Sequence, residues 1–239
     1  MFMLKYFFLV FAFFPSLIWL LFYLKKDIHP EPKKMILKIF FLGMLLVIPV
    51  AFLEKGIAEL LNKLNFFPIF LSSLIYAFLV VALIEESAKY LVIKIKVIKN
   101  KEFNEPVDAM IYMITAGLGF AALENFFVFW PLIKTSQAIE LLMLGSFRFI
   151  GAVFLHALCS GVIGYFLGLS FFQTTQTKKN KNQLLVIGFL IAVFLHGSYN
   201  FFIILNKKNL EIIMPLIILF GLALFVSWGF RKLKLINSN

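Results

Sequence analysis

Long apolar stretches alternate with short polar connections along the whole chain. Seven stretches are long enough to cross about 30 Å of hydrocarbon at roughly 1.5 Å per helical residue. We place them at residues 6–24, 36–53, 66–93, 107–130, 143–170, 184–205 and 212–230. Because the hydrocarbon region admits only helices or closed barrels, the pattern predicts an all-α fold, a polytopic transmembrane helix bundle of about seven helices.

Composition excludes a soluble protein. Hydrophobic residues make up 62% of the 239 residues and charged residues only 15%, whereas soluble domains average about 45–50% and 25%. The net charge of +11 does not point to nucleic acid, because the basic residues form short clusters between apolar stretches. More of these basic residues follow the first, third, fifth and last stretches than lie in the other connections. The positive-inside rule therefore predicts an external N-terminus and a cytoplasmic C-terminus.

The stretch 66–93 contains ionisable side chains that lipid disfavours. It reads Glu85-Glu86-Ser-Ala-Lys89, so that Lys89 lies one helical turn from both carboxylates. Two adjacent carboxylates in a low-dielectric site resist double ionisation unless a cation compensates them. This group is either an ion pair that only stabilises the helix or part of a catalytic site.

The stretch 107–130 carries Glu124, which has no cation within one turn. We therefore expect a partner on another helix, and Phe120, one turn earlier, can form a wall of the same site. Asp108 stands where this helix begins, and a carboxylate there is an ordinary helix cap. Arg148 is expected to pair with a carboxylate or a lipid phosphate.

Two of the three histidines, His156 and His196, lie in the middle of apolar stretches, and Asn200 follows His196 by one turn. Together with the glutamates they fit three kinds of site. A glutamate can activate a water while histidine assists. The two histidines and a glutamate can bind Zn²⁺. Carboxylates and histidines can also relay protons in a transporter, so these residues alone leave the choice open.

The sequence resembles the PrsW family of intramembrane proteases in four blocks that follow the family's order. The first is Glu85-Glu86-Ser-Ala-Lys89, similar to the family's EExxK motif. The other three are Pro106-Val-Asp108 to Tyr112 with Gly117 to Asn125, Arg148 with Phe154-Leu-His156-Ala-Leu158 and the glycines after it, and Leu195-His196-Gly-Ser-Tyr-Asn200.

This resemblance implies an endopeptidase that cleaves membrane-anchored proteins, related to the CAAX-protease and bacteriocin-processing group. It implies one transmembrane protease domain, residues 1–239 with its core at 66–205, in the bacterial cytoplasmic membrane. Carried over by position, the catalytic residues are Glu85, Glu86, Glu124, His156 and His196, with Asn200 as a polar helper. We favour water activated by glutamate without a cofactor, with zinc bound by His156 and His196 as the alternative. No nucleic acid partner is expected.

Two other functions and one geometric difficulty stay open. A proton-coupled transporter would need a continuous polar path, and a catalytically silent scaffold would tolerate loss of Glu124 or His156. At about 1.5 Å per residue, Glu85 and Glu124 would differ in depth by roughly 10 Å or more. One shared site therefore requires that helix 66–93 extends into the 90s with a tilt, or that helix 107–130 begins later.

Overall fold

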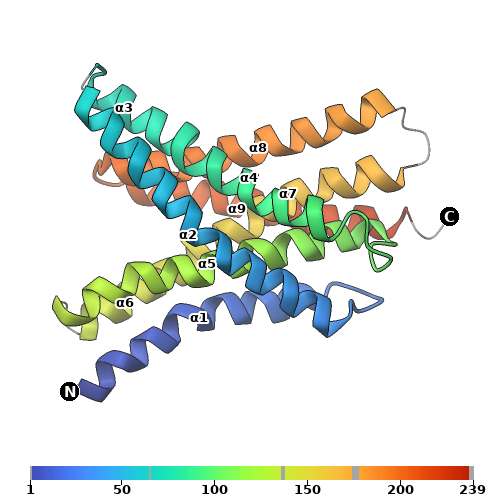
Figure 1. Ribbon diagram of the computed structural model, residues 1–239, viewed down its shortest axis with the longest axis horizontal. Coiled ribbons are helices and arrows are strands. Elements are labelled where there is room, and N and C mark those ends of the chain that lie inside the picture. Colours follow the sequence, from blue (N-terminus) through green and yellow to red (C-terminus); the bar gives the residue numbers. More distant parts are fainter. Residues whose placement is uncertain (1, 65, 136–137, 174–177, 237–239) are drawn as a thin grey trace.

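The computed structural model describes residues 2–64, 66–135, 138–173 and 178–236, and this part of the chain forms seven helical rods (Figure 1). The all-helical prediction is confirmed. The bounds are α1 Phe2–Leu24, α2 Lys33–Leu64, a third rod of α3 Ile69–Ile75, the π-helix η1 Tyr76–Ala82 and α4 Leu83–Lys96, then α5 Pro106–Thr135, α6 Ala138–Ile150, α7 Ala152–Phe172, α8 Lys178–Leu205 and α9 Leu210–Lys234.

Six of these rods are long and apolar enough to cross a membrane, namely α2, the third rod, α5, α6 with α7, α8 and α9. Over its described side chains, α1 is a shorter apolar helix, Ala12–Leu24. The chain is therefore a multi-pass integral membrane protein, as predicted.

Helix α5 is the central helix and is almost entirely buried, with α7, α2 and α1 packed around it (Figure 1). Two glycines of α7 allow this packing. A Cβ at Gly164 would lie 2.6 Å from the Cα of Met110, and one at Gly168 would lie 2.5 Å from the carbonyl oxygen of Pro106. Small residues let membrane helices approach closely without a hydrophobic driving force, and here they set the distance between the two helices that carry Glu124 and His156.

Two helix boundaries differ from the sequence prediction. Helix α2 continues beyond residue 53 to Leu64, because residues 54–64 carry four charged side chains among residues that mostly favour helix, and the apolar stretch therefore ends before the helix does. Glu54 thus lies inside α2. The predicted single helix 143–170 is divided at Gly151 into α6 and α7, where the Tyr199 hydroxyl occupies the space that a side chain at Gly151 would need.

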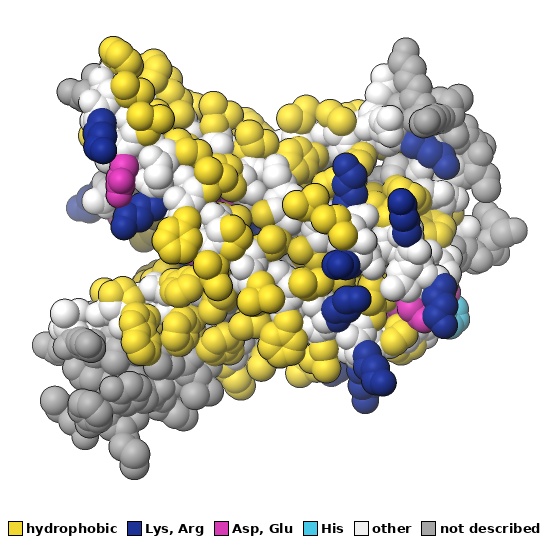
Figure 2. Space-filling model, in the orientation of Figure 1, with side chains coloured by type: hydrophobic (Ala, Val, Ile, Leu, Met, Phe, Trp, Pro, Cys, Tyr) yellow, Lys and Arg dark blue, Asp and Glu magenta, His cyan; other side chains and the backbone are white. Residues whose placement is uncertain are grey.

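One end of the bundle gathers the connection from α1 to α2, the connection from α4 to α5 and the end of α9 (Figure 1). Figure 2 shows dark blue Lys and Arg side chains over the same, right-hand end. Asp108 accepts hydrogen bonds from the backbone N–H groups of Asn104 (2.9 Å) and Glu105 (2.7 Å), which confirms its predicted role as a helix cap. The assignment of this end to the cytoplasm stays a prediction.

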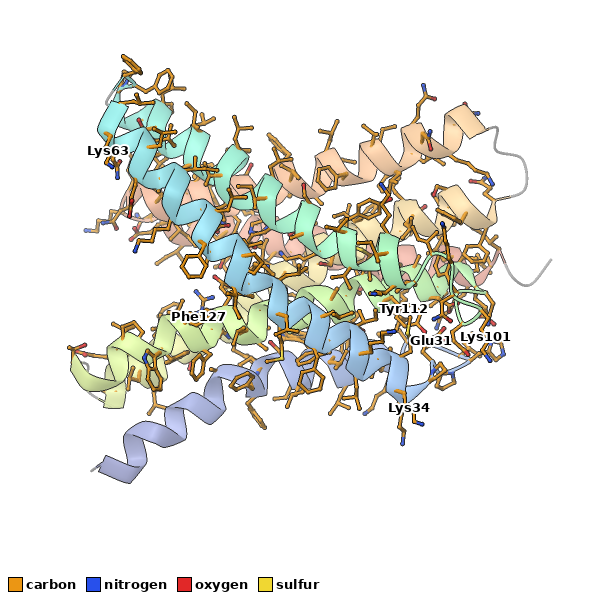
Figure 3. All side chains as sticks on the ribbon, in the orientation of Figure 1. Glu31, Lys34, Lys63, Lys101, Tyr112 and Phe127 are labelled. Atoms are coloured by element: carbon orange, nitrogen blue, oxygen red, sulfur yellow. The ribbon has the colours of Figure 1, made fainter. Side chains whose placement is uncertain are left out.

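At this end Tyr112 donates a hydrogen bond to Glu31, which joins the loop before α2 to α5 (Figure 3). Burial raises the pKa of Glu31 to about 8. Because the folded pKa is raised, the protonated carboxyl stabilises the fold below its ordinary pKa of 4.5, and this contribution is lost as the pH rises through about 8.

We therefore expect the melting temperature in detergent to fall between about pH 5 and pH 9, and to fall less in Glu31→Gln, whose amide cannot ionise. The exposed Glu59 of α2 offers the control Glu59→Gln, which should keep the wild-type dependence. An equal fall in wild type and Glu31→Gln would contradict the assignment.

Candidate active site

The third rod presents Glu85, Glu86 and Lys89 to the interior. The π-helix η1 ends just before them, and π segments inside helices often accompany functional sites. Lys89 is fully buried and donates hydrogen bonds to Glu86 Oε1 at 2.7 Å and to Glu85 Oε2 at 3.1 Å. The predicted pairing with either carboxylate is therefore realised with both.

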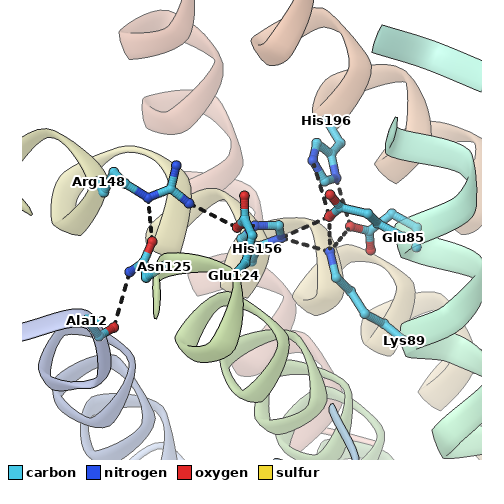
Figure 4. Close-up of polar contacts among 9 residues, drawn as sticks. Ala12, Glu85, Lys89, Glu124, Asn125, Arg148, His156 and His196 are labelled. Carbon is cyan, nitrogen blue, oxygen red and sulfur yellow. Dashed lines mark hydrogen bonds and ion pairs between the residues drawn. The ribbon is translucent and has the colours of Figure 1, made fainter. Parts of the chain in front are cut away.

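His156 of α7 links this group to Glu124 of α5 (Figure 4). Its Nδ1 lies 2.7 Å from Lys89 Nζ and its Nε2 lies 2.9 Å from Glu124 Oε2. An ammonium only donates and a carboxylate only accepts. Nδ1 must therefore accept, and the imidazole is neutral with its proton on Nε2, donated to Glu124. Phe120 forms the predicted wall, with its ring under Lys89 and beside His156.

His196 of α8 reaches the same acids from the opposite side. Its Nδ1 lies 2.8 Å from Glu86 Oε1, so that Nδ1–H donates to this carboxylate. Its Nε2 then faces Glu85 Oε2 at 3.8 Å, too far for a hydrogen bond. A carboxylate on one ring nitrogen fixes the tautomer and leaves the other nitrogen free to accept a proton or bind a metal. Gly197 lets η1 pack against α8 here, since a Cβ would lie 2.5 Å from the ring of Phe78.

Glu124 receives its cation from another helix, as expected: Arg148 Nη2 of α6 lies 3.0 Å from Glu124 Oε2. This contact is an ion pair without hydrogen-bond alignment, because Nη2 forms no hydrogen bond among the described residues. Arg148 Nε donates to Asn125, and Asn125 donates to the carbonyl of Ala12 at 3.3 Å (Figure 4). Asn125 therefore holds the arginine, a role that sequence reasoning missed although Asn125 directly follows Glu124.

A cavity of about 190 Å³ adjoins these groups where α2, α4 and α5 meet, which gives room for several water molecules. Glu54, Glu85 and Glu124 supply its carboxylates. Its other walls are apolar, formed by Val47, Val50, Ala51, Phe120, Phe127 and Val128. Glu86, His156 and His196 stand behind this lining and connect to it through hydrogen bonds. Of the five predicted catalytic residues, Glu85 and Glu124 therefore line the predicted common cavity directly.

The expected difference in depth between Glu85 and Glu124 is overcome in the first of the two predicted ways, by extension and tilt of the helix that carries Glu85. Helix α4 extends to Lys96 and runs obliquely across α5 (Figure 1). Lys89 and His156 span the remaining distance, because Lys89 Nζ donates to Glu85 Oε2 and to His156 Nδ1, and His156 Nε2 donates to Glu124 Oε2. The two carboxylates therefore belong to one polar network.

Asn200 is the predicted site residue that this network does not include. It lies one turn beyond His196 on α8, and in the described ranges of the chain it makes no hydrogen bond to the glutamates or histidines. Its role as a polar helper stays a prediction.

The buried donors fit a metal ion by their chemistry. Ligand atoms of Glu85, Glu86, His156 and His196 all lie within 4.8 Å of one another, and two imidazoles with carboxylate oxygens are a ligand set that Zn²⁺ accepts. However, Lys89 Nζ lies within hydrogen-bond distance of Glu85, Glu86 and His156. The ammonium thus holds the centre of the group, and a metal ion there would require this side chain to move.

The fold and the site together assign this chain to a class. It is a polytopic membrane protein with a polar site inside the helix bundle, made of buried glutamates and histidines beside a cavity. Comparison with known proteins identifies the family. The family described as "PrsW family intramembrane metalloprotease" matches residues 31–228. The chain therefore belongs to the PrsW family of intramembrane proteases, as its four motif blocks indicated.

Curated relatives agree with this assignment. The chain is 32% identical over 229 residues to Protease PrsW of Oceanobacillus iheyensis, covering 94% of each chain. It is 32% identical over 188 residues to Protease PrsW of Geobacillus kaustophilus, covering 78% of this chain and 75% of the relative. It is 31% identical over 215 residues to Protease PrsW of Bacillus subtilis, covering 89% and 87%. No solved structure matches the chain.

Proposed function

We propose that this chain hydrolyses peptide bonds of membrane-anchored proteins with a water molecule activated by Glu85. The observation that carries the proposal is that Glu85 and Glu124 both line one cavity and are joined by hydrogen bonds through Lys89 and His156. We treat the whole chain as one protease domain, with its Lys-rich end in the cytoplasm.

Glu85 is better placed to act as the general base than Glu86 or Glu124. It borders the cavity, whereas Glu86 is fully buried behind it and is held by Lys89 and His196. Glu124 also borders the cavity, but it is paired with both Arg148 and His156. A base must reach the water whose proton it takes, and Glu85 combines this access with the longer contact to Lys89.

In the proposed reaction Glu85 takes a proton from water, and the hydroxide adds to the carbonyl carbon of the scissile bond. The C–N bond then breaks, and Glu85 returns the proton to the leaving amine nitrogen. Lys89 and Arg148 supply positive charge beside the two carboxylates, where a low dielectric strengthens its effect on the developing oxyanion. His156 and His196 keep these groups in position.

If a metal ion is bound, Glu85, Glu86, His156 and His196 would hold it, and it would supply Lewis-acid polarisation of the carbonyl and a more acidic water. We favour the reaction without metal, because Lys89 already provides a cation among these four residues.

The test is proteolysis of a tagged single-span protein by the purified chain in detergent. We expect cleavage by wild type, with and without a chelator, and its loss in Glu86→Ala and His196→Ala. Cleavage that survives both substitutions would show that the reaction does not take place at this site. Loss on chelation with rescue by zinc would replace the metal-free reaction by one with a bound metal.

A further inference from the structure

Glu54 is a carboxylate of the cavity that the proposed reaction does not use. It lies on α2, outside the four motif blocks, and it lines the cavity together with Glu85 and Glu124. The other two carboxylates have cationic partners, Lys89 and Arg148. Glu54 has none among the described residues, and its Oε1 is shielded from solvent without a hydrogen-bond partner.

The apolar surroundings of Glu54 make the absence of a partner for its carboxylate energetically unfavourable. Its neighbours in the cavity wall are Val47, Val50 and Ala51 of α2, with Phe120 and Phe127 facing them from α5. A carboxylate in apolar surroundings within the membrane needs a cation or hydrogen-bond donors. A charged donor satisfies an ionised carboxylate better than a neutral one, because it adds Coulombic attraction, which the low dielectric inside the protein strengthens.

The position of Glu54 shows from where such a partner can come. The cavity lies where α2, α4 and α5 meet, and α2 and α5 diverge on one side of the molecule (Figure 1). Figure 2 shows the surface hollowed at this place. Figure 3 shows Phe127 beside the same opening, and its side chain is 43% exposed. Glu54 and Phe127 line this cavity together with Glu85.

We propose that Glu54 is a specificity-determining residue, which forms an ion pair with a Lys or Arg side chain of the substrate close to the scissile bond. The substrate then supplies the cationic partner that Glu54 lacks among the described residues, while the apolar walls hold the neighbouring residues of the substrate's membrane segment. This inference rests on the proposed proteolytic function and adds a substrate preference to it.

The experiment uses the single-span substrate of the proteolysis assay, with its cut bond located by mass spectrometry. Lys, Leu or Glu is placed in turn at each position that flanks the cut, and kcat/KM is measured for each. Wild type should prefer Lys over Leu by about tenfold to a hundredfold at one position, the range expected for a hydrogen bond to a charged group, and should cleave the Glu substrate most slowly.

The variants separate this preference from a structural role of Glu54. In Glu54→Gln, which has the same shape without charge, the ratio of Lys to Leu should fall to near one. In Glu54→Lys the order of Lys and Glu should reverse. The control Glu59→Gln, at an exposed position of the same helix, should keep the wild-type ratio.

Each outcome decides a different claim. An unchanged ratio in Glu54→Gln, or no preference in wild type, would overturn the role of Glu54 while leaving proteolysis intact. If Glu54→Lys does not fold, the ratio in Glu54→Gln alone decides. Failure of wild type to cleave any of the substrates would instead refute the proteolytic function, and the role of Glu54 with it.

Discussion

Replacement of Glu85 by Gln is expected to lower kcat for a membrane-anchored substrate by about 10²–10⁴-fold, the usual range for loss of general acid–base catalysis. The amide keeps the size of the side chain but cannot take a proton from water. Binding of the substrate should change little, because the apolar walls of the cavity stay in place. The effect should therefore appear in kcat, with KM nearly unchanged.

The fold should survive this substitution, because Lys89 keeps its 2.7 Å contact with Glu86. Thermal unfolding of the variant in detergent checks this point, and Glu59→Gln provides a matched control on an exposed glutamate. A Glu85→Gln variant that retains more than about a tenth of wild-type kcat would show that another group activates the water.

Replacement of Lys89 by Met is expected to destabilise the fold strongly. Lys89 is fully buried and bonds to Glu85, Glu86 and His156. Its loss leaves two buried carboxylates without their cation, and breaking a buried ion pair in this way typically costs about 3–5 kcal/mol. The free energy of unfolding, measured by titration with SDS in mixed micelles, should fall by this amount, and proteolysis should be lost.

Lys94 of the same helix is exposed, and Lys94→Met should change the unfolding free energy by less than about 0.5 kcal/mol. A triple variant that combines Lys89→Met with Glu85→Gln and Glu86→Gln should regain part of the lost stability, because neutral amides do not require a cation. Equal stability of Lys89→Met and wild type would contradict the buried network, whereas a triple variant no more stable than Lys89→Met would show that packing of the lysine stem is what matters.

The sequence was sufficient for features that depend on the local chain. The period of the helix places Glu85, Glu86 and Lys89 within one turn, and the absence of a nearby cation predicted that Glu124 pairs with another helix. Hydropathy located the seven helical rods, but it ended α2 at residue 53, because it measures apolar character and not helix propensity. That early end hid Glu54 from the list of candidate site residues.

What the sequence by itself determined is therefore the number of helices, the family and the ionisable groups that must find partners inside the membrane. Only the tertiary structure decided which residues meet: His156 lies between Lys89 and Glu124, and Asn125 holds Arg148. It also placed Glu54 in the same cavity wall as Phe120. The physical reason is that contacts within a helix follow from its fixed rise and period, whereas contacts between helices depend on tilt and rotation, which are set by packing against neighbours.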